Sequence, residues 1–125
     1  MATNDSWQTK EMRELFETIL ALEGTDEAAA FFRDLCTLGE LRDMAQRWAV
    51  VRMLDAGLHY AEISQRTGAS TATVTRIASW LHHGEGGYRA ALDRLAASTA
   101  AATATSSRRS RTRTGGSRPY PVRDE

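Results

Sequence analysis

The sequence has few of the features that mark a secreted or membrane-spanning protein. It contains one cysteine, Cys36, so it cannot form an internal disulfide, and this suits a reducing compartment. No apolar run is long enough to cross a bilayer, and the N-terminus has no basic segment followed by an apolar one. We therefore expect a soluble cytoplasmic protein with no membrane contact, in which Cys36 is a small buried hydrophobic residue.

Strand patterns and the residue sets of catalytic or metal centres are also missing. No segment alternates apolar and polar residues, so we expect an all-α fold of about six helices. The sequence has no nucleophile-and-base arrangement, no phosphate-binding glycine loop before a helix and no converging pair of carboxylates. The three histidines and Cys36 do not have the spacing of metal ligands. We expect a protein that is not an enzyme and that binds neither a metal nor a cofactor.

The chain has no net charge, but its charges are unevenly distributed. Residues 1–96 contain 10 basic and 14 acidic residues, whereas residues 97–125 contain 6 arginines and 2 acids. Within the first part, residues 63–94 carry four arginines, His82 and His83 against only two acids. Affinity for nucleic acid depends on the local sign of charge near the phosphates, so the overall balance does not exclude DNA binding.

Apolar residues recur at helical spacing in three segments of the N-terminal half. The first helix is expected to end near Glu23, the second to begin near Thr25, and the third to span Leu38–Ala56. Polar residues that can cap these three helices are Asp5 or Ser6, Thr25 or Asp26, and Thr37. Thr37 is followed three residues later by Glu40, which is the spacing of a capping box.

Residues 60–81, YAEISQRTGASTATVTRIASWL, have the pattern of a helix-turn-helix. Ser64 is small enough for two helices to approach closely, and Gly68 can adopt the positive φ of a tight turn. Apolar residues at helical spacing would hold the two helices together; they are Ile63, Val74, Ile77 and Leu81. The opposite face carries short hydroxyls and one arginine, which can approach base edges and phosphates; its residues are Ser70, Thr71, Thr73, Thr75, Arg76 and Ser79.

The C-terminal part of the chain differs in composition from the rest. A last helix is expected from Tyr88 to about Ala97, and beyond Leu95 there is no Leu, Ile, Phe, Met or Trp. Because such a segment cannot bury enough apolar surface to offset its ordering entropy, we expect residues 98–125 to be disordered. The arginines of this tail fit either a solvated segment or a sequence-independent contact with DNA phosphates.

The folded part, residues 1–97, has many large apolar side chains for its size. They include Trp7, Phe16, Phe31, Phe32 and Trp48. A domain of this size buries only about two-thirds of its surface on its own. A second copy could cover the remaining apolar faces, so we expect a homodimer, although the composition also permits a monomer.

Three segments resemble the Trp repressor superfamily, and most closely its YerC/YecD-like branch. They are QRWAVVRMLDAG, TGASTATVTRI and GEGGY, within a similarity that extends from about Phe31 to Leu92. The resemblance implies an intertwined all-helical homodimer whose two DNA-reading heads lie about one helical turn of DNA apart. It also implies a transcriptional regulator, expected to be a repressor, that acts at an operator with two-fold symmetry.

The resemblance also places an altered ligand pocket on this chain. The two arginines that enclose the indole of the superfamily's corepressor are matched by Arg47 and Arg76, and a threonine at the pocket mouth is matched by Thr37. A glycine and a serine of that pocket are replaced by Ile77 and Trp80. Burying a bulky apolar side chain is worth about 1.5–3 kcal/mol, so we expect Ile77 and Trp80 to fill the pocket from within. Free tryptophan would then not bind, and an unidentified small-molecule effector stays open.

The expected DNA contacts are partly those of the superfamily. The N-terminus of its reading helix maps to Thr71, Ala72 and Thr73, with Thr75 one turn further on. Backbone N–H groups at such a terminus can meet phosphates or bound water. A base-reading arginine of the superfamily is replaced by Ala61, so we expect a different sequence preference. Gln65 and Arg66 are expected to contact phosphates from the first helix of the pair.

Two functions of different classes follow from these patterns. The first is a homodimeric, sequence-specific regulator of transcription that binds double-stranded DNA and is associated with the nucleoid. The second is a helical adaptor whose hairpin docks a protein without reading DNA, because any α-helical bundle can place glycine and apolar residues in this way.

Overall fold

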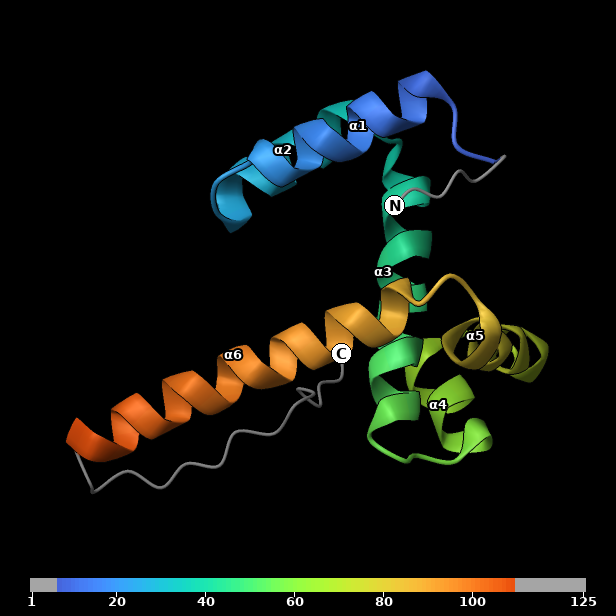
Figure 1. Ribbon diagram of the computed structural model, residues 1–125. Coiled ribbons are helices and arrows are strands. Elements are labelled where there is room, and N and C mark those ends of the chain that lie inside the picture. The colour runs from blue at the N-terminus through green and yellow to red at the C-terminus, as the bar shows by residue number, and fades with distance from the viewer. Residues whose placement is uncertain (1–6, 110–125) are drawn as a thin grey trace. The chain divides into compact units, whose positions relative to one another are not determined.

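The computed structural model describes residues 7–109, with side chains to residue 103, and contains six helices within that range (Figure 1). No strand occurs in the described residues, which confirms the predicted all-α fold. The helices are α1 (Lys10–Ala21), α2 (Thr25–Leu35), α3 (Leu38–Asp55), α4 (Tyr60–Thr67), α5 (Thr71–His83) and α6 (Gly87–Arg109).

The chain divides into two compact units, Met1–Arg42 and Asp43–Glu125. The first unit contains α1 and α2, and the second contains α4, α5 and α6. The third helix begins in the first unit and ends in the second. The predicted helix-turn-helix, residues 60–81, therefore lies entirely within the second unit.

The first helix begins later than predicted. Its first residue is Lys10, and its N-cap is Thr9, whose hydroxyl accepts a hydrogen bond from the Met12 N–H at 3.0 Å. The predicted caps, Asp5 and Ser6, lie outside the described residues. The Thr9 hydroxyl thus satisfies one of the donors that the first turn of the helix leaves unpaired.

The second helix is also capped differently from the prediction. Gly24, at φ 88°, is its N-cap, so Thr25 and Asp26 lie in the first turn instead of capping it. The Glu27 carboxylate accepts a hydrogen bond from the Glu23 N–H at 2.6 Å. A glutamate of the first turn thus bonds the backbone ahead of the helix, and no side chain at the cap position is needed.

The predicted capping box at the start of α3 is confirmed. The Glu40 N–H donates to the Thr37 hydroxyl at 3.1 Å, and the Thr37 N–H donates to the Glu40 carboxylate at 2.8 Å. These reciprocal bonds satisfy two donors that the helix itself leaves unpaired. They place the helix start at Leu38, as predicted, and its last residue, Asp55, is one residue before the predicted end.

The described residues of the first unit, from Trp7 onward, form no buried apolar core in the single chain. Neither α1 nor α2 contains a buried residue, and the Leu20 side chain is 84% exposed. The other large apolar residues exposed in this unit are Trp7, Met12, Phe16, Leu35 and Leu38. The amphipathic faces of its helices are therefore largely open to solvent.

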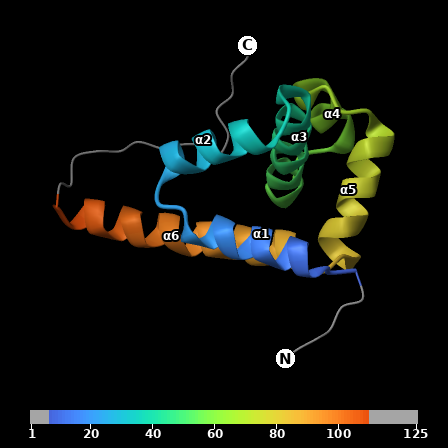
Figure 2. The same ribbon diagram turned by 90° about the horizontal axis from the view of Figure 1, so that it is seen from above.

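The second unit is built around a continuous apolar core. The core draws residues from α3, α4, α5 and α6, and α5 contacts both α4 and α6 (Figure 2). Its buried members are Val50, Val51, Ile63, Ala69, Val74, Ile77, Leu81 and Leu92. At its edge the rings of Trp48 and Tyr88 lie 6.2 Å apart, and the Arg89 guanidinium contacts the Asp55 carboxylate at 2.8 Å. These contacts attach the beginning of α6 to α3.

The last helix is longer than predicted. It continues past Ala97, its predicted end, to Arg109. This segment is rich in alanine, which has the highest intrinsic helix propensity, and it extends a helix that is already nucleated on the core through Leu92. Residues 110–125, the rest of the predicted tail, lie outside the described residues.

Candidate nucleic-acid interface

A tight turn at Gly68 joins the two helices of the predicted helix-turn-helix. Gly68 is the C-cap of α4, and its backbone is left-handed at φ 83°. Its N–H donates to the Ser64 carbonyl at 2.9 Å, which closes the last turn of the helix. A side chain at this φ would be strained even though the nearest atom to a Cβ would be 3.7 Å away, so the backbone conformation explains the glycine.

Hydroxyl groups hold the chain through this turn. The Ser64 hydroxyl donates to the Ala69 carbonyl at 2.6 Å. The Thr67 hydroxyl donates to the Ile63 carbonyl at 2.7 Å and accepts from the Ala69 N–H at 3.1 Å. Ser64 therefore does more than provide a small side chain, because it bonds the segment that leads into α5.

Gln46 of α3, which no sequence pattern indicated, also stabilises the turn. The Gln46 amide donates to the Thr67 carbonyl at 3.0 Å, in a partly buried position. Gln46 lies four residues before the buried Val50, so it shares the inward face of α3. A polar residue at an inward helical position was the signal that could have identified it.

The second helix of the pair presents two opposite faces. The inward face is buried, with Val74 fully covered and Ile77 1% exposed, and it also includes Ala78 and Leu81. The outward face is exposed and includes Thr71, Ala72, Thr75, Arg76 and Ser79, with the exposed Trp80 beside them. The structure thus brings together on one surface five of the residues predicted to contact DNA.

Two of the predicted contacts are engaged in capping this helix. Ser70 is the N-cap of α5, and its hydroxyl accepts from the Thr73 N–H and donates to the Thr73 hydroxyl, both at 3.0 Å. Thr73 is partly buried, whereas Thr71 is exposed. The Thr75 hydroxyl donates to the Thr71 carbonyl at 2.9 Å. Because the hydroxyls of Ser70 and Thr73 already form these bonds, they have less capacity to hydrogen-bond a ligand.

The two arginines of the pair have different surroundings. Within the described part of the chain, the Arg76 side chain makes no hydrogen bond or ion pair, and the same holds for Gln65 on α4. Arg66, also on α4, contacts Glu62 one turn earlier, with 2.8 Å between its Nη2 and the Glu62 Oε2. The predicted phosphate contact at Arg66 is thus already paired with a carboxylate.

The residues of the predicted ligand pocket are divided between the two units of the chain. Thr37 lies in the first unit and is engaged in the capping box of α3, while Arg47 and Arg76 are exposed residues of the second unit. Ile77 is in the core as expected, but the Trp80 side chain is 47% exposed. The exposure of Trp80 follows from its position on α5, which falls beside the buried stripe of Ile77 and Leu81.

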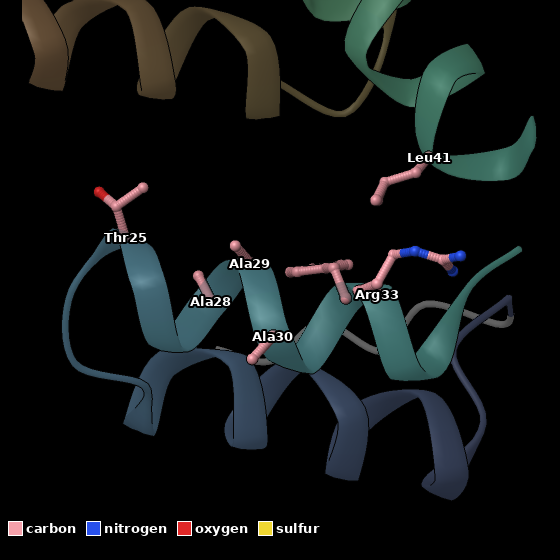
Figure 3. Close-up of a pocket in the computed structure, with 7 residues that line it drawn as sticks. Thr25, Ala28, Ala29, Ala30, Arg33 and Leu41 are labelled. Atoms are coloured by element: carbon pink, nitrogen blue, oxygen red, sulfur yellow. The ribbon is translucent and has the colours of Figure 1, made fainter. Parts of the chain in front are cut away.

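The first unit contains an apolar hollow between α2 and the start of α3 (Figure 3). It is lined by Thr25, Ala28, Ala29, Ala30, Phe32, Arg33 and Leu41. None of the residues predicted to contact DNA or a ligand lines it. This hollow belongs to the unit without a buried core and not to the helix-turn-helix.

Other kinds of site are not indicated by the described residues. No group of three or more His, Cys, Asp or Glu residues in that part of the chain could hold a metal ion. No helix there combines the length and apolar composition needed to span a membrane. Cys36 is partly buried and forms the C-cap of α2.

Comparison with known proteins gives a consistent result. A family model described as "Trp repressor protein" matches residues 10–96. The uncharacterized protein YerC of Bacillus subtilis is 45% identical over 91 residues, which are 73% of this chain and 88% of YerC. The crystal structure of a TrpR-like protein from Eubacterium eligens is 40% identical, with a TM-score of 0.70 over 74% of this chain and 96% of that chain. A solved structure from Staphylococcus aureus is 42% identical, with a TM-score of 0.66 over 70% of this chain and 88% of its own.

Gln46 provides a test of how the turn is held. The substitution Gln46→Met keeps the side-chain length but removes the donor, so the partly buried Thr67 carbonyl loses its amide partner. We expect the free energy of unfolding to fall by about 1–3 kcal/mol. Urea titrations at one fixed chain concentration measure this change. Gln65→Met, at an exposed position on α4, is the matched control and should stay within about 0.5 kcal/mol of the parent. Equal stability of the two variants would show that the Gln46 bond does not support the turn.

Proposed function

Because the chain belongs to the Trp repressor family, we propose that it is a sequence-specific regulator of transcription that binds double-stranded DNA and acts as a repressor. The family is one of DNA-binding regulators and not of enzymes, which agrees with the expected absence of catalytic activity.

The outward face of α5 is the observation on which the proposal depends. Thr71, Ala72, Thr75, Arg76 and Ser79 are exposed together, and the opposite face of the helix is buried. A major groove accepts an α-helix, and short side chains let the helix backbone approach the base edges. Arg76 adds a positive charge that is unpaired among the described residues.

The start of α5 offers further groups to DNA. Thr73 N–H is satisfied by Ser70, but the N–H groups of Thr71 and Ala72 have no carbonyl partner within the helix. The positive end of the helix dipole lies at the same place, which favours a phosphate oxygen or a bound water there. The helix N-terminus would therefore fix the orientation of α5, while its outward side chains would read the sequence.

Fragments of genomic DNA selected by binding to the protein provide the preferred sequence for a first test. Fluorescence anisotropy across a salt series should then show that affinity falls steeply, by about 0.9 decades per decade of salt for each phosphate neutralised. Thr71→Val removes a hydroxyl with little change of shape, and we expect it to reduce the affinity ratio between preferred and random duplexes. Arg76→Gln should weaken binding to both duplexes.

Thr99→Val is the control for these variants, because Thr99 is exposed on α6 away from the helix-turn-helix. It should bind both duplexes as the parent does. Parent protein that binds no duplex, or binds with no salt dependence, would contradict the proposal and favour the adaptor function. Unchanged preference in Thr71→Val together with unchanged affinity in Arg76→Gln would show that α5 is not the reading helix.

We further propose that the regulator is a homodimer. The first unit buries no side chain of α1 or α2, and it exposes Leu20, Phe16 and Met12 along one face of α1. A stable protein rarely leaves so extended an apolar face open to solvent. A second copy covering these faces would also supply the second reading head that a two-fold symmetric operator requires.

The oligomeric state can be measured by sedimentation equilibrium, which should give twice the chain mass of 13.8 kDa. Leu20→Glu places a charge where the apolar face is most exposed in the single chain, so we expect it to shift the equilibrium toward monomer. Thr18→Glu adds the same charge beside Glu14 on the polar face of α1 and should remain dimeric. A parent protein of single-chain mass at micromolar concentration would contradict the dimer.

We also propose that free tryptophan is not the effector. Ile77 stands where the family's pocket has a glycine, and it is 1% exposed within the core of the second unit. Its neighbour along the helix, Trp80, adds a second bulky side chain near Arg76. An indole between the two arginines would then have to compete for space with this chain's own side chains.

Calorimetric titration with L-tryptophan at millimolar concentration tests this proposal. We expect no saturable heat from the parent protein, because displacing a packed isoleucine is unfavourable. Trp80→Ser removes the more exposed of the two bulky side chains and should also bind no tryptophan if Ile77 alone is sufficient. Saturable binding of tryptophan to the parent protein, near one site per chain, would contradict the proposal that tryptophan is not the effector.

A further inference from the structure

One acidic residue stands apart in the helix-turn-helix. Glu62 is the only Asp or Glu between Asp55 and Glu85, a segment that includes all of α4 and α5. Its carboxylate contacts the Arg66 guanidinium, with Glu62 Oε2 and Arg66 Nη2 2.8 Å apart. The pair is i,i+4 on α4, and both side chains are partly exposed, at 42% for Glu62 and 43% for Arg66. The carboxylate therefore lies within reach of whatever the arginine contacts.

The pair contributes no net charge to the surface. A phosphate that approaches Arg66 meets a guanidinium that is already bonded to one anion. Counterions are released from DNA when protein cations neutralise its phosphates, so an arginine compensated by its own carboxylate adds little to the sequence-independent affinity. Arg76 is not compensated in this way by any described residue. The two arginines of the helix pair are thus electrostatically unequal.

A structural role alone also fits the pair and has to be separated from this effect. Glu at i and Arg at i+4 is the favourable orientation on a helix, and Glu62 lies in the first turn, where a negative charge suits the helix dipole. This role would stabilise the short helix α4 without altering DNA affinity. Only DNA binding distinguishes the two roles, since both predict some loss of helix stability when Glu62 is neutralised.

We propose that Glu62 restrains Arg66 and so lowers the affinity for DNA of any sequence by a common factor. This inference rests on the proposed DNA-binding function. The carboxylate lowers the phosphate affinity that all sequences share, and in this way it keeps sequence-independent binding weak. The preferred sequence is unaffected, because Glu62 is on α4 and not on the reading helix.

The test uses the full chain with a random duplex and the duplex selected from genomic DNA. Glu62→Gln should increase the salt slope of binding by about 0.9 per chain, because one more phosphate is neutralised. If affinities converge near 1 M salt, this slope corresponds to a rise of roughly eightfold at 0.1 M salt. The rise should be the same for both duplexes, so the ordering of preferred sequences does not change.

Two further variants isolate the mechanism. Glu62→Gln combined with Arg66→Gln should show no gain over Arg66→Gln alone, because the carboxylate acts through that arginine. Glu85→Gln removes the same charge from the loop after α5 and should change the slope less, since Glu85 pairs with no arginine in the described residues. Urea titration of each variant shows that it is folded under the binding conditions.

The outcomes separate this inference from the proposed function. A parent protein that shows no salt-dependent DNA binding overturns the proposed function and the role of Glu62 with it. A parent that binds DNA, with a Glu62→Gln variant of identical slope and affinity, overturns only the role of Glu62. A gain that persists in the Arg66→Gln background, or that Glu85→Gln reproduces in full, also overturns it.

Discussion

The apolar cluster shared by α3, α4, α5 and α6 is the constraint on which the second unit depends. Val74, Ile77 and Leu81 direct one face of α5 inward, and the helical repeat then directs Thr71, Thr75 and the residues beside them outward. Interiors are closely packed, so α5 cannot rotate about its axis without exposing a core residue or burying a polar one. The packing therefore fixes which positions of α5 face outward. It does not fix which side chains stand at those positions, because they are not part of the core.

The sequence patterns predicted those parts of the fold that are controlled by neighbouring residues. The capping box of Thr37 and Glu40, the left-handed turn at Gly68 and the buried stripe of α5 each depend on groups within one or two turns of each other. Their geometry is specified by short-range stereochemistry, so spacing alone identifies them. The outward face of α5 followed from the same stripe, which is why Thr71, Thr75, Arg76 and Ser79 could be named from the spacing, whereas Ala72 was named from the family resemblance.

Two kinds of feature could not be predicted in this way: those set by two opposing local tendencies, and those that depend on residues far apart in the sequence. Gln46 and Thr67 are 21 residues apart, so no helical pattern relates them. At the end of α6, the helix propensity of alanine favours a longer helix, whereas the lack of apolar residues favours an earlier end. The helix continues to Arg109. Burial of Trp80 was expected from its size, but its position beside the buried stripe leaves it 47% exposed in the single chain. In each case a local pattern was compatible with more than one tertiary environment.

The two units show that a chain with no net charge can still present distinct electrostatic surfaces. Acidic residues gather on the helices of the first unit, where Lys10 and Arg13 pair with glutamates at distances near 4 Å. In the helix-turn-helix the single carboxylate is bonded to Arg66, and Arg76 is left uncompensated on the outward face of α5. Fields from charges farther away than about 8–10 Å are largely screened at physiological salt, so the field at the surface of α5 is set mainly by the charges of the helix pair itself. The sign of charge that a nucleic acid meets is consequently set by a few residues near the groove, and pairing between those residues matters more than the total.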